Sequence, residues 1–226
     1  MPTIFERALE YVVDGSVVGL GSGRAANRFT ESLGARVRAG LNVRGVATSR
    51  ATAELAAKVG VPLVSLEPGM QLSVAVDGAD EVDPQLDLIK GYGRAMLRER
   101  VVAASARRFV ILVGREKLVG RLGERGKMPL EVASFAVPVC LDRLRSLGYE
   151  ATLVVDDGRP FVTDNGNHAI DCRIGPIDDA RRLQQQLRSI PGLVDTGLFL
   201  DAAHIVLIGG SDTFELEEER RRPLPS

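Results

Sequence analysis

Four carboxylates follow one alternating apolar segment, residues 72–76: Asp77, Asp80, Glu81 and Asp83. In an α/β protein, the residues directly after a buried strand lie at the edge of the sheet where ligands bind. By themselves these carboxylates have three interpretations: a capped helix start, a Mg²⁺ or Ca²⁺ site, and an acid/base site for sugar hydroxyl groups. Their spacing differs from that of a calcium-binding loop, so a metal site is the least favoured of the three.

Lys90 and Glu99 extend this set downstream. Lys90 opens a loop with two glycines, and Glu99 lies six residues beyond Gly93 on a predicted helix. A lysine can stabilise a developing oxyanion, and a carboxylate can remove a proton from a carbon beside a carbonyl. The alternative is an exposed helical glutamate that pairs with Arg98 or Arg100, as most glutamates do. Position alone does not decide between these two interpretations.

Gly19, Gly21 and Gly23 separate a predicted strand from a predicted helix. Glycines there let backbone N–H groups approach an anion at the positive end of the helix, which would form a phosphate cradle. A tight strand-to-helix turn also needs glycine, and the two interpretations weigh about equally. No Gly-Lys-Ser/Thr follows, so the turn is not a Walker loop. The next predicted strand also ends without the acid of a dinucleotide-binding fingerprint.

Alternating strand and helix patterns must position these groups. Strands are predicted at 17–20, 41–46, 62–66, 72–76 and 109–113, and helices separate most of them. This alternation predicts a mostly parallel sheet covered on both faces.

The pattern changes at Met128-Pro129. The sequence there predicts strands at 130–136 and 152–155 around a helix that ends near Gly148. The segments 161–163 and 168–170 flank a turn rich in Asn and Gly at 164–167, and a helix follows at about 178–189, so we expect a small α+β insertion. A strand at 203–208 is predicted to return to the first sheet. The charge run at 215–222 is predicted to be a solvated end.

Composition excludes several classes of function. The chain has 226 residues, 45% hydrophobic and 26% charged, with a formal net charge of -1, so no basic surface for nucleic acid or an anionic membrane is expected. No apolar run is long enough to span a membrane, and the start lacks a signal-peptide pattern. Two cysteines, Cys140 and Cys172, do not make a disulfide framework, so we expect a cytoplasmic protein. Neither cysteine has a neighbouring helix start or cationic cluster to activate it, so we expect no thiol catalysis. His168 and His204 are isolated and are expected to be structural or at the surface.

Taken together, the motifs resemble the type A ribose-5-phosphate isomerase family over nearly the whole chain. The matching segments occur in the order of the family, at 18–23, 48–52, 76–83, 88–91, 97–100, 129–132, 162–167 and 196–199. The resemblance implies isomerisation between ribose 5-phosphate and ribulose 5-phosphate without a metal or a redox cofactor.

The resemblance also implies roles for individual residues. Glu99 matches the base that moves a proton between C2 and C1 through an enediolate. Asp77, Asp80 and Lys90 match the groups that open the sugar ring and steady its oxygens, which leaves Glu81 and Asp83 to local structure. The implied substrate-binding residues are Ser22, Gly23, Arg24, Ala25, Gly78, Ala79, Gly91, Tyr92, Gly93 and Lys117.

The chain departs from the family's pattern around the expected substrate. Arg24 and Ala25 replace small hydroxyl residues, Tyr92 and Arg94 interrupt a loop that is normally made of small residues, and Gly114 replaces an acid three residues before Lys117. Arg24 could restore phosphate contacts through its planar guanidinium, whereas Tyr92 could crowd the sugar. These departures keep two alternatives open: an isomerase of another sugar phosphate, and a sugar-phosphate-binding regulatory protein without turnover.

We therefore expect a Rossmann-like α/β domain at 1–126 plus 197–226, with a smaller α+β, ferredoxin-like domain inserted at 127–196. The expected ligand is a small sugar phosphate, and the resemblance implies a homodimer or homotetramer.

Overall fold

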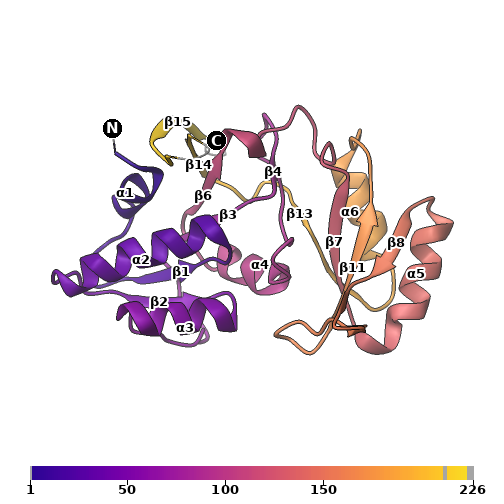
Figure 1. The fold of residues 1–226 in the computed structure, drawn as a ribbon, viewed down its shortest axis with the longest axis horizontal. Coiled ribbons are helices and arrows are strands. Elements are labelled where there is room, and N and C mark those ends of the chain that lie inside the picture. The colour runs from indigo at the N-terminus through magenta and orange to yellow at the C-terminus, as the bar shows by residue number, and fades with distance from the viewer. Residues whose placement is uncertain (1, 211–212, 223–226) are drawn as a thin grey trace. The chain divides into compact units, whose positions relative to one another are not determined.

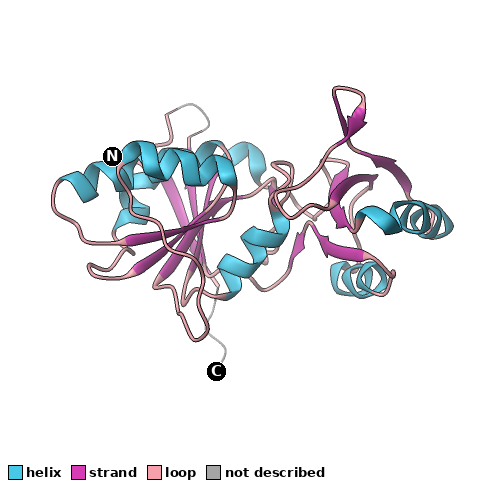
Figure 2. Ribbon diagram, turned by 90° about the horizontal axis from the view of Figure 1, so that it is seen from below, coloured by secondary structure: helices cyan, strands magenta, loops and turns pink. Residues whose placement is uncertain are grey.

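The computed structural model describes residues 2–210 and 213–222. The chain divides into two compact units (Figures 1 and 2). The first unit contains Met1–Ala79, Arg98–Leu118 and Asp201–Ser226, and the second contains Asp80–Leu97 and Val119–Leu200. Residues 1, 211–212 and 223–226, which belong to the expected first domain, lie outside the described residues.

A six-stranded sheet forms the centre of the first unit, in the order β15-β14-β6-β3-β1-β2. Its strands are β1 (Val17–Leu20), β2 (Arg44–Ala47), β3 (Val74–Gly78), β6 (Phe109–Gly114), β14 (Ile205–Gly209) and β15 (Leu216–Arg221). All neighbouring pairs are parallel except β14 and β15. The predicted α/β class with a mostly parallel sheet is confirmed, and so is the return of the late strand to the first sheet.

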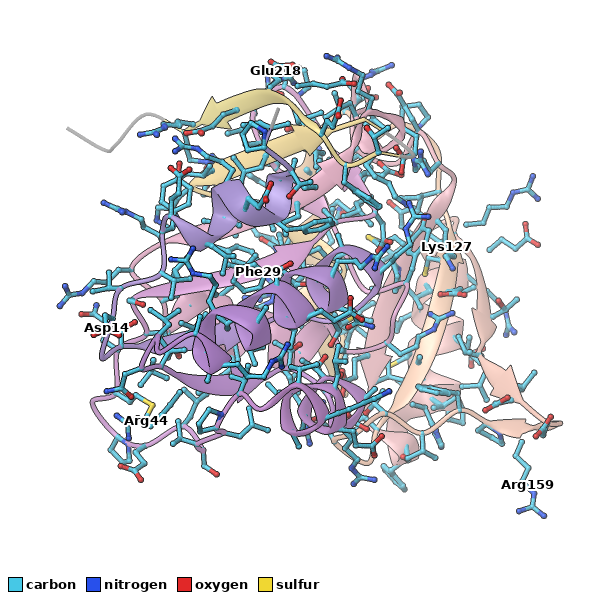
Figure 3. All side chains as sticks on the ribbon, turned by 60° about the vertical axis from the view of Figure 1, so that its left-hand side comes forward. Asp14, Phe29, Arg44, Lys127, Arg159 and Glu218 are labelled. Atoms are coloured by element: carbon cyan, nitrogen blue, oxygen red, sulfur yellow. The ribbon has the colours of Figure 1, made fainter. Side chains whose placement is uncertain are left out.

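Alternate residues of these strands build the main apolar core. Val18, Val76 and Leu112 pack with buried residues of α1 (Ile4–Leu9), α2 (Arg24–Arg38) and α3 (Arg50–Val59). Phe29 of α2, labelled in Figure 3, is fully buried there. The hydroxyl of Ser49 caps α3, as Ser and Thr do at helix starts.

The helix α4 (Met96–Ala104) covers the other face of the sheet. A Cβ on Gly19 would lie 2.5 Å from Val102 Cγ1 and 2.8 Å from the Cβ of Ala75. Only glycine lets this helix approach β1 so closely. Because strand residues alternate between faces, Asp77 shares its face with Ala75 and therefore lies on the side that α4 covers.

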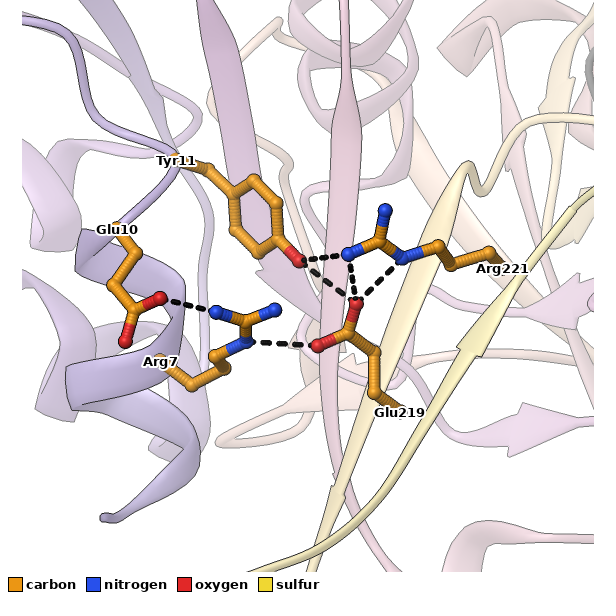
Figure 4. A network of polar contacts seen from close by, with 5 residues as sticks. All are labelled: Arg7, Glu10, Tyr11, Glu219 and Arg221. Atoms are coloured by element: carbon orange, nitrogen blue, oxygen red, sulfur yellow. Dashed lines mark hydrogen bonds and ion pairs between the residues drawn. The ribbon is translucent and has the colours of Figure 1, made fainter.

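Two predictions about the first unit are wrong. The segment 62–66 forms no regular strand; it contributes a single bridge, from Leu63 to Gly45, at an exposed edge. The charge run near the end is the edge strand β15, not a solvated end. Its Glu219 accepts hydrogen bonds from Arg7 Nε (2.8 Å) and the Tyr11 hydroxyl (2.9 Å), as Figure 4 shows. Paired charges thus fix this strand to the N-terminal segment.

The second unit contains a four-stranded antiparallel sheet in the order β12-β7-β11-β8. In chain order its elements are β7 (Lys127–Val132), α5 (Val137–Ser146), β8 (Glu150–Leu153), β11 (His168–Arg173), α6 (Ala180–Arg188) and β12 (Leu193–Thr196). This βαββαβ order is that of a ferredoxin-like fold. Met128, Leu130 and Ile170 join buried residues of both helices in a separate core.

Short elements complete the two units. The hairpin β9 (Val155–Asp156) and β10 (Arg159–Pro160) and the 3₁₀ helix η2 (Ser134–Ala136) lie in the second unit, and the 3₁₀ helix η1 (Arg115–Lys117) lies in the first. A small sheet of the second unit joins β4 (Glu81–Val82), β5 (Leu88–Ile89) and β13 (Leu198–Phe199).

The compact units differ in their bounds from the expected domains. The segment Asp80–Leu97 belongs to the second unit because its strand β5 pairs with β13. The domain boundaries drawn from the sequence stay a prediction. Within 2–210 and 213–222, no helix is long and apolar enough to cross a membrane.

Candidate active site

Asp77 lies near the carboxyl end of β3 and is only 2% exposed. Its Oδ1 accepts hydrogen bonds from the backbone N–H groups of Ser22 (3.1 Å) and Gly78 (2.8 Å). A Cβ on Gly21 would overlap the Asp77 carboxylate. Gly21 therefore has a specific local role, because its missing side chain leaves the space that this carboxylate fills.

The turn after β1 is further fixed by hydroxyl groups. Ser22 Oγ lies 2.8 Å from Thr48 Oγ1 and 2.9 Å from Ser49 Oγ, and Thr52 Oγ1 donates to the Gly21 carbonyl at 2.9 Å. The start of α3 thus holds the turn that precedes α2.

Gly23 is the N-cap of α2, with a positive φ of 95° that favours glycine. Arg24 is the first helical residue, and its exposed side chain places the guanidinium carbon 5.2 Å from the centre of the Phe214 ring. The half-buried Ala25 has its Cβ 3.9 Å from where a Cβ on Gly78 would stand. The helix start therefore combines a positive dipole end with one exposed cation.

Glu99 lies in the first turn of α4 and is only 4% exposed. It precedes Val102 by one helical turn, so both point to the same side of the helix, and Val102 packs on the sheet face that carries Asp77. The chain leaves α4 toward the start of β6, which places the first turn of α4 at the carboxyl edge of the sheet. The interpretation of Glu99 as an exposed surface glutamate is wrong.

Lys117 ends the 3₁₀ helix η1 after β6 and is partly exposed. One residue before it, Glu116 folds back onto Gly114, and a Cβ on Gly114 would overlap the Glu116 carboxylate. The Glu116 carboxylate thus fills the space beside Gly114 that a side chain at position 114 would need. Sequence reasoning missed Glu116, although Gly114 followed closely by an acid was a usable signal.

Asp80 and Lys90 lie in the second unit. The backbone N–H of Asp80 donates to the Ile89 carbonyl at 2.8 Å, and that of Lys90 donates to the Gly197 carbonyl at 2.9 Å. The first bond places Asp80 beside Ile89, the last residue of β5, which directly precedes Lys90 in the chain. Lys90 is 3% exposed, and its Nζ lies 5.6 Å from the centre of the Phe199 ring.

The loop after Lys90 begins with Gly91, whose φ is 106° and whose missing Cβ leaves room for Met96. The next residue, Tyr92, donates its backbone N–H to Asp80 Oδ2 at 3.0 Å. Burial, and then the nearby Asp80 charge, raises the pKa of the Tyr92 phenol to about 12. Gly93 is exposed at the tip of the loop.

Glu81 and Asp83 serve the local backbone, as the sequence predicts. Glu81 accepts hydrogen bonds from the N–H groups of Gly123 (2.6 Å) and Arg125 (3.0 Å), and burial raises the pKa of its carboxyl group. Asp83 Oδ1 accepts from two N–H groups of its own turn, each at 2.9 Å. These hydrogen bonds give both carboxylates a structural role, so neither needs a catalytic one to explain its position.

His204 is structural as well, because its Nδ1 accepts a hydrogen bond from the Phe109 N–H at 3.1 Å. No cluster of three or more His, Cys, Asp or Glu side chains among the described residues could hold a metal ion.

Comparisons with known proteins agree with these motifs. The family model "Ribose 5-phosphate isomerase A (phosphoriboisomerase A)" matches residues 44–213. A relative from Roseiflexus castenholzii, ribose-5-phosphate isomerase A, is 49% identical over 92% of this chain and 90% of its own.

Solved structures agree too. Ribose 5-phosphate isomerase A from Methanocaldococcus jannaschii has a TM-score of 0.89 at 37% identity, covering 97% of this chain and 96% of its own. A D-ribose-5-phosphate isomerase in complex with phospho-erythronic acid has a TM-score of 0.88 at 34% identity, covering 98% of this chain and 100% of its own. With sequence, fold and family model in agreement, this chain belongs to the ribose 5-phosphate isomerase A family.

Proposed function

We propose that this protein interconverts D-ribose 5-phosphate and D-ribulose 5-phosphate, with Glu99 as the base. The observation that carries the proposal is the burial of Glu99, at 4% exposure, on the side of α4 that faces the sheet side of Asp77. Glutamate is rarely so fully buried in a folded protein. The names of the relatives support ribose 5-phosphate as the substrate, and nothing favours another sugar phosphate or a regulatory protein.

The chemistry moves one proton from C2 to C1 and a second from O2 to O1, and it changes no overall oxidation state. In the open-chain aldose, Glu99 removes the C2 proton, and the electrons of that bond form the C1–C2 double bond of an enediolate. The protonated Glu99 returns the proton to C1, while the O2 hydroxyl proton is transferred to O1, so that O2 becomes the ketone oxygen and O1 becomes a hydroxyl group. A base in contact with the C–H bond and a stabilised oxyanion are the two requirements of such a step.

Lys90 would stabilise the enediolate oxygen, since its ammonium is almost fully withdrawn from water and a charge acts more strongly there. Asp77 and Asp80 would exchange the hydroxyl protons needed to open the sugar ring. Asp77 is suited to this role because two backbone N–H groups fix its Oδ1.

The phosphate and the sugar hydroxyl groups need further contacts. We assign the phosphate to the start of α2, where Ser22, Gly23, Arg24 and Ala25 combine a helix dipole with a guanidinium. Gly78 and Ala79, the backbone of the loop 91–93 and Lys117 are the other proposed substrate contacts.

We also propose the homodimer or homotetramer that the family resemblance implies. Phe135 is 99% exposed and Val139 51% exposed, both on the second unit. Large exposed apolar side chains support an interface between subunits. Sedimentation equilibrium should give a multiple of the chain mass for the wild type and a smaller mass for Phe135→Ser; a monomeric wild type would contradict the assembly.

The test of the proposed function is turnover of ribose 5-phosphate by the wild type, Glu99→Gln and Glu54→Gln. Glu54 is an exposed glutamate of α3 and serves as the matched control. We expect activity in the wild type and the control, and a loss of at least 100-fold in kcat for Glu99→Gln. A wild type that binds ribose 5-phosphate without turning it over would contradict the function.

A further inference from the structure

The short loop that follows Lys90, residues 91–94, carries two large side chains, those of Tyr92 and Arg94. Residues 91–94 form a turn closed by a 2.9 Å hydrogen bond from the Arg94 N–H to the Gly91 carbonyl. Gly91 and Gly93 contribute no side chains, so only Tyr92 and Arg94 can tie this turn to its surroundings through side chains, beside the backbone hydrogen bond from Tyr92 to Asp80. Their side chains contact Lys127 and Asp171, which also belong to the second unit.

Arg94 has a left-handed backbone conformation, with a φ of 65°. This conformation disfavours any residue with a Cβ, and glycine adopts it freely. An arginine at such a position indicates that its side chain makes a contact worth the strain.

That contact is a two-point ion pair with Asp171 on β11. Arg94 Nη1 lies 2.5 Å from Asp171 Oδ1, and Nη2 lies 2.8 Å from Oδ2. The side chains are only 16% and 22% exposed, so water screens the pair less than a surface pair. A planar guanidinium on a carboxylate fixes direction as well as distance.

Tyr92 makes the second attachment, to Lys127 on β7, which Figure 3 labels. The Lys127 ammonium stands 3.9 Å from the centre of the Tyr92 ring, and the Tyr92 hydroxyl donates to the Lys127 carbonyl at 3.3 Å. Lys127 Nζ also lies 3.8 Å from Asp171 Oδ2. The four side chains therefore form one connected cluster. Its two residues on the sheet, Lys127 and Asp171, come from β7 and β11, which are hydrogen-bonded neighbours.

We propose that Tyr92, Arg94, Lys127 and Asp171 form a clamp that holds the Lys90 loop on the β7–β11 sheet and thereby keeps the Lys90 ammonium in its working position. Tyr92 and Arg94 are then positioning residues, not groups that crowd the sugar. This inference rests on the proposed function, in which Lys90 stabilises the enediolate.

The clamp explains why two departures from a small-residue loop occur together. A loop of glycines is free to move, and a shift of about 1 Å in a catalytic group can cost about 100-fold in rate. The bulky residues reduce this freedom without entering the chemistry. Because Lys90 acts on the transition state, loosening the loop should lower kcat more than it raises KM.

The decisive variant is Arg94→Gly, which removes the ion pair and also relieves the backbone strain. We expect the midpoint of urea unfolding to stay near that of the wild type, amide hydrogen exchange across 91–95 to accelerate at least 10-fold, and kcat to fall at least 10-fold with KM changed less than 3-fold. Arg121→Ala, which breaks an exposed ion pair with Asp178 in the same unit, is the control and should change none of these.

Two further comparisons separate the clamp from other roles. Asp171→Ala should reproduce the effects of Arg94→Gly, and the double variant should be no slower than either, because both act through one contact. Tyr92→Phe keeps the ring on Lys127 and should retain most of kcat, whereas Tyr92→Ala should lose it.

Two results would overturn the clamp. One is unchanged hydrogen exchange at 91–95 in Arg94→Gly. The other is a Tyr92→Ala variant with a lower KM and an undiminished kcat, which would mean that Tyr92 crowds the sugar. Hydrogen exchange is measured without turnover, so an inactive wild type would reject the proposed function and leave the exchange result to decide the clamp.

Discussion

Gly21→Ala is the substitution that most sharply tests how the Asp77 carboxylate is held. The added Cβ would overlap the Asp77 carboxylate, so one of the two must move. The carboxylate would lose its hydrogen bonds from the Ser22 and Gly78 N–H groups, now 3.1 and 2.8 Å long. Overpacking of this kind costs about 1–3 kcal/mol of the free energy of unfolding. Displacing a catalytic group by about 1 Å costs about 100-fold in rate.

We therefore expect Gly21→Ala to unfold at a lower urea concentration, by about 1–3 kcal/mol, and to lose at least 10-fold in kcat. Gly175→Ala is the matched control: a Cβ there meets nothing within 4 Å and Gly175 has no positive φ. That variant should keep its activity and gain or lose less than about 1 kcal/mol. If Gly21→Ala retained both the stability and the kcat of the wild type, the space at Gly21 would not be set by Asp77, and the reasoning would fail.

Three other substitutions test separate parts of the structure. Arg24→Ala should raise KM for ribose 5-phosphate about 10-fold or more with a smaller change in kcat, whereas Arg28→Ala, one turn later on α2, should behave as the wild type. Burial, followed by nearby arginines, lowers the pKa of His204 below 6.5, so stability that is present at pH 7.5 should be lost progressively as the pH falls below 6.5 toward this lowered pKa. His204→Asn should lose less stability in urea between pH 7.5 and 5.5; an equal loss would contradict this role. Glu131, fully buried, accepts three side-chain hydrogen bonds between 2.9 and 3.0 Å, and Glu131→Ala should cost about 3 kcal/mol in urea unfolding, with a cost below about 1 kcal/mol arguing against it.

The parallel sheet could be predicted because its central strands are short apolar runs between turn signals. The end of β3 was harder to place. Asp77 and Gly78 resemble a turn in the sequence, yet they pair with Ile111 and Leu112 of β6. The edge strand β15 had no signal, because an edge strand with two partly exposed faces carries charges where a central strand carries apolar residues.

The site could be predicted in its residue types but not in its burial or long-range contacts. Glu99 looks like any helical glutamate, and only tertiary packing makes it a buried one. Arg94 and Asp171 lie 77 residues apart, so their ion pair has no local pattern. Glu116 was overlooked because only the folded chain brings its carboxylate beside Gly114.

The role of Glu99 as the proton-moving base is tested most directly by solvent exchange in D₂O. Proton NMR of ribose 5-phosphate incubated with the wild type should show deuterium entering at C2, and ribulose 5-phosphate should carry it at C1, since the proton on Glu99 exchanges with solvent during turnover. Glu99→Gln should show no incorporation above the uncatalysed rate, while Glu54→Gln should match the wild type. Incorporation by Glu99→Gln at the rate of the wild type would contradict the assignment of Glu99 as the base.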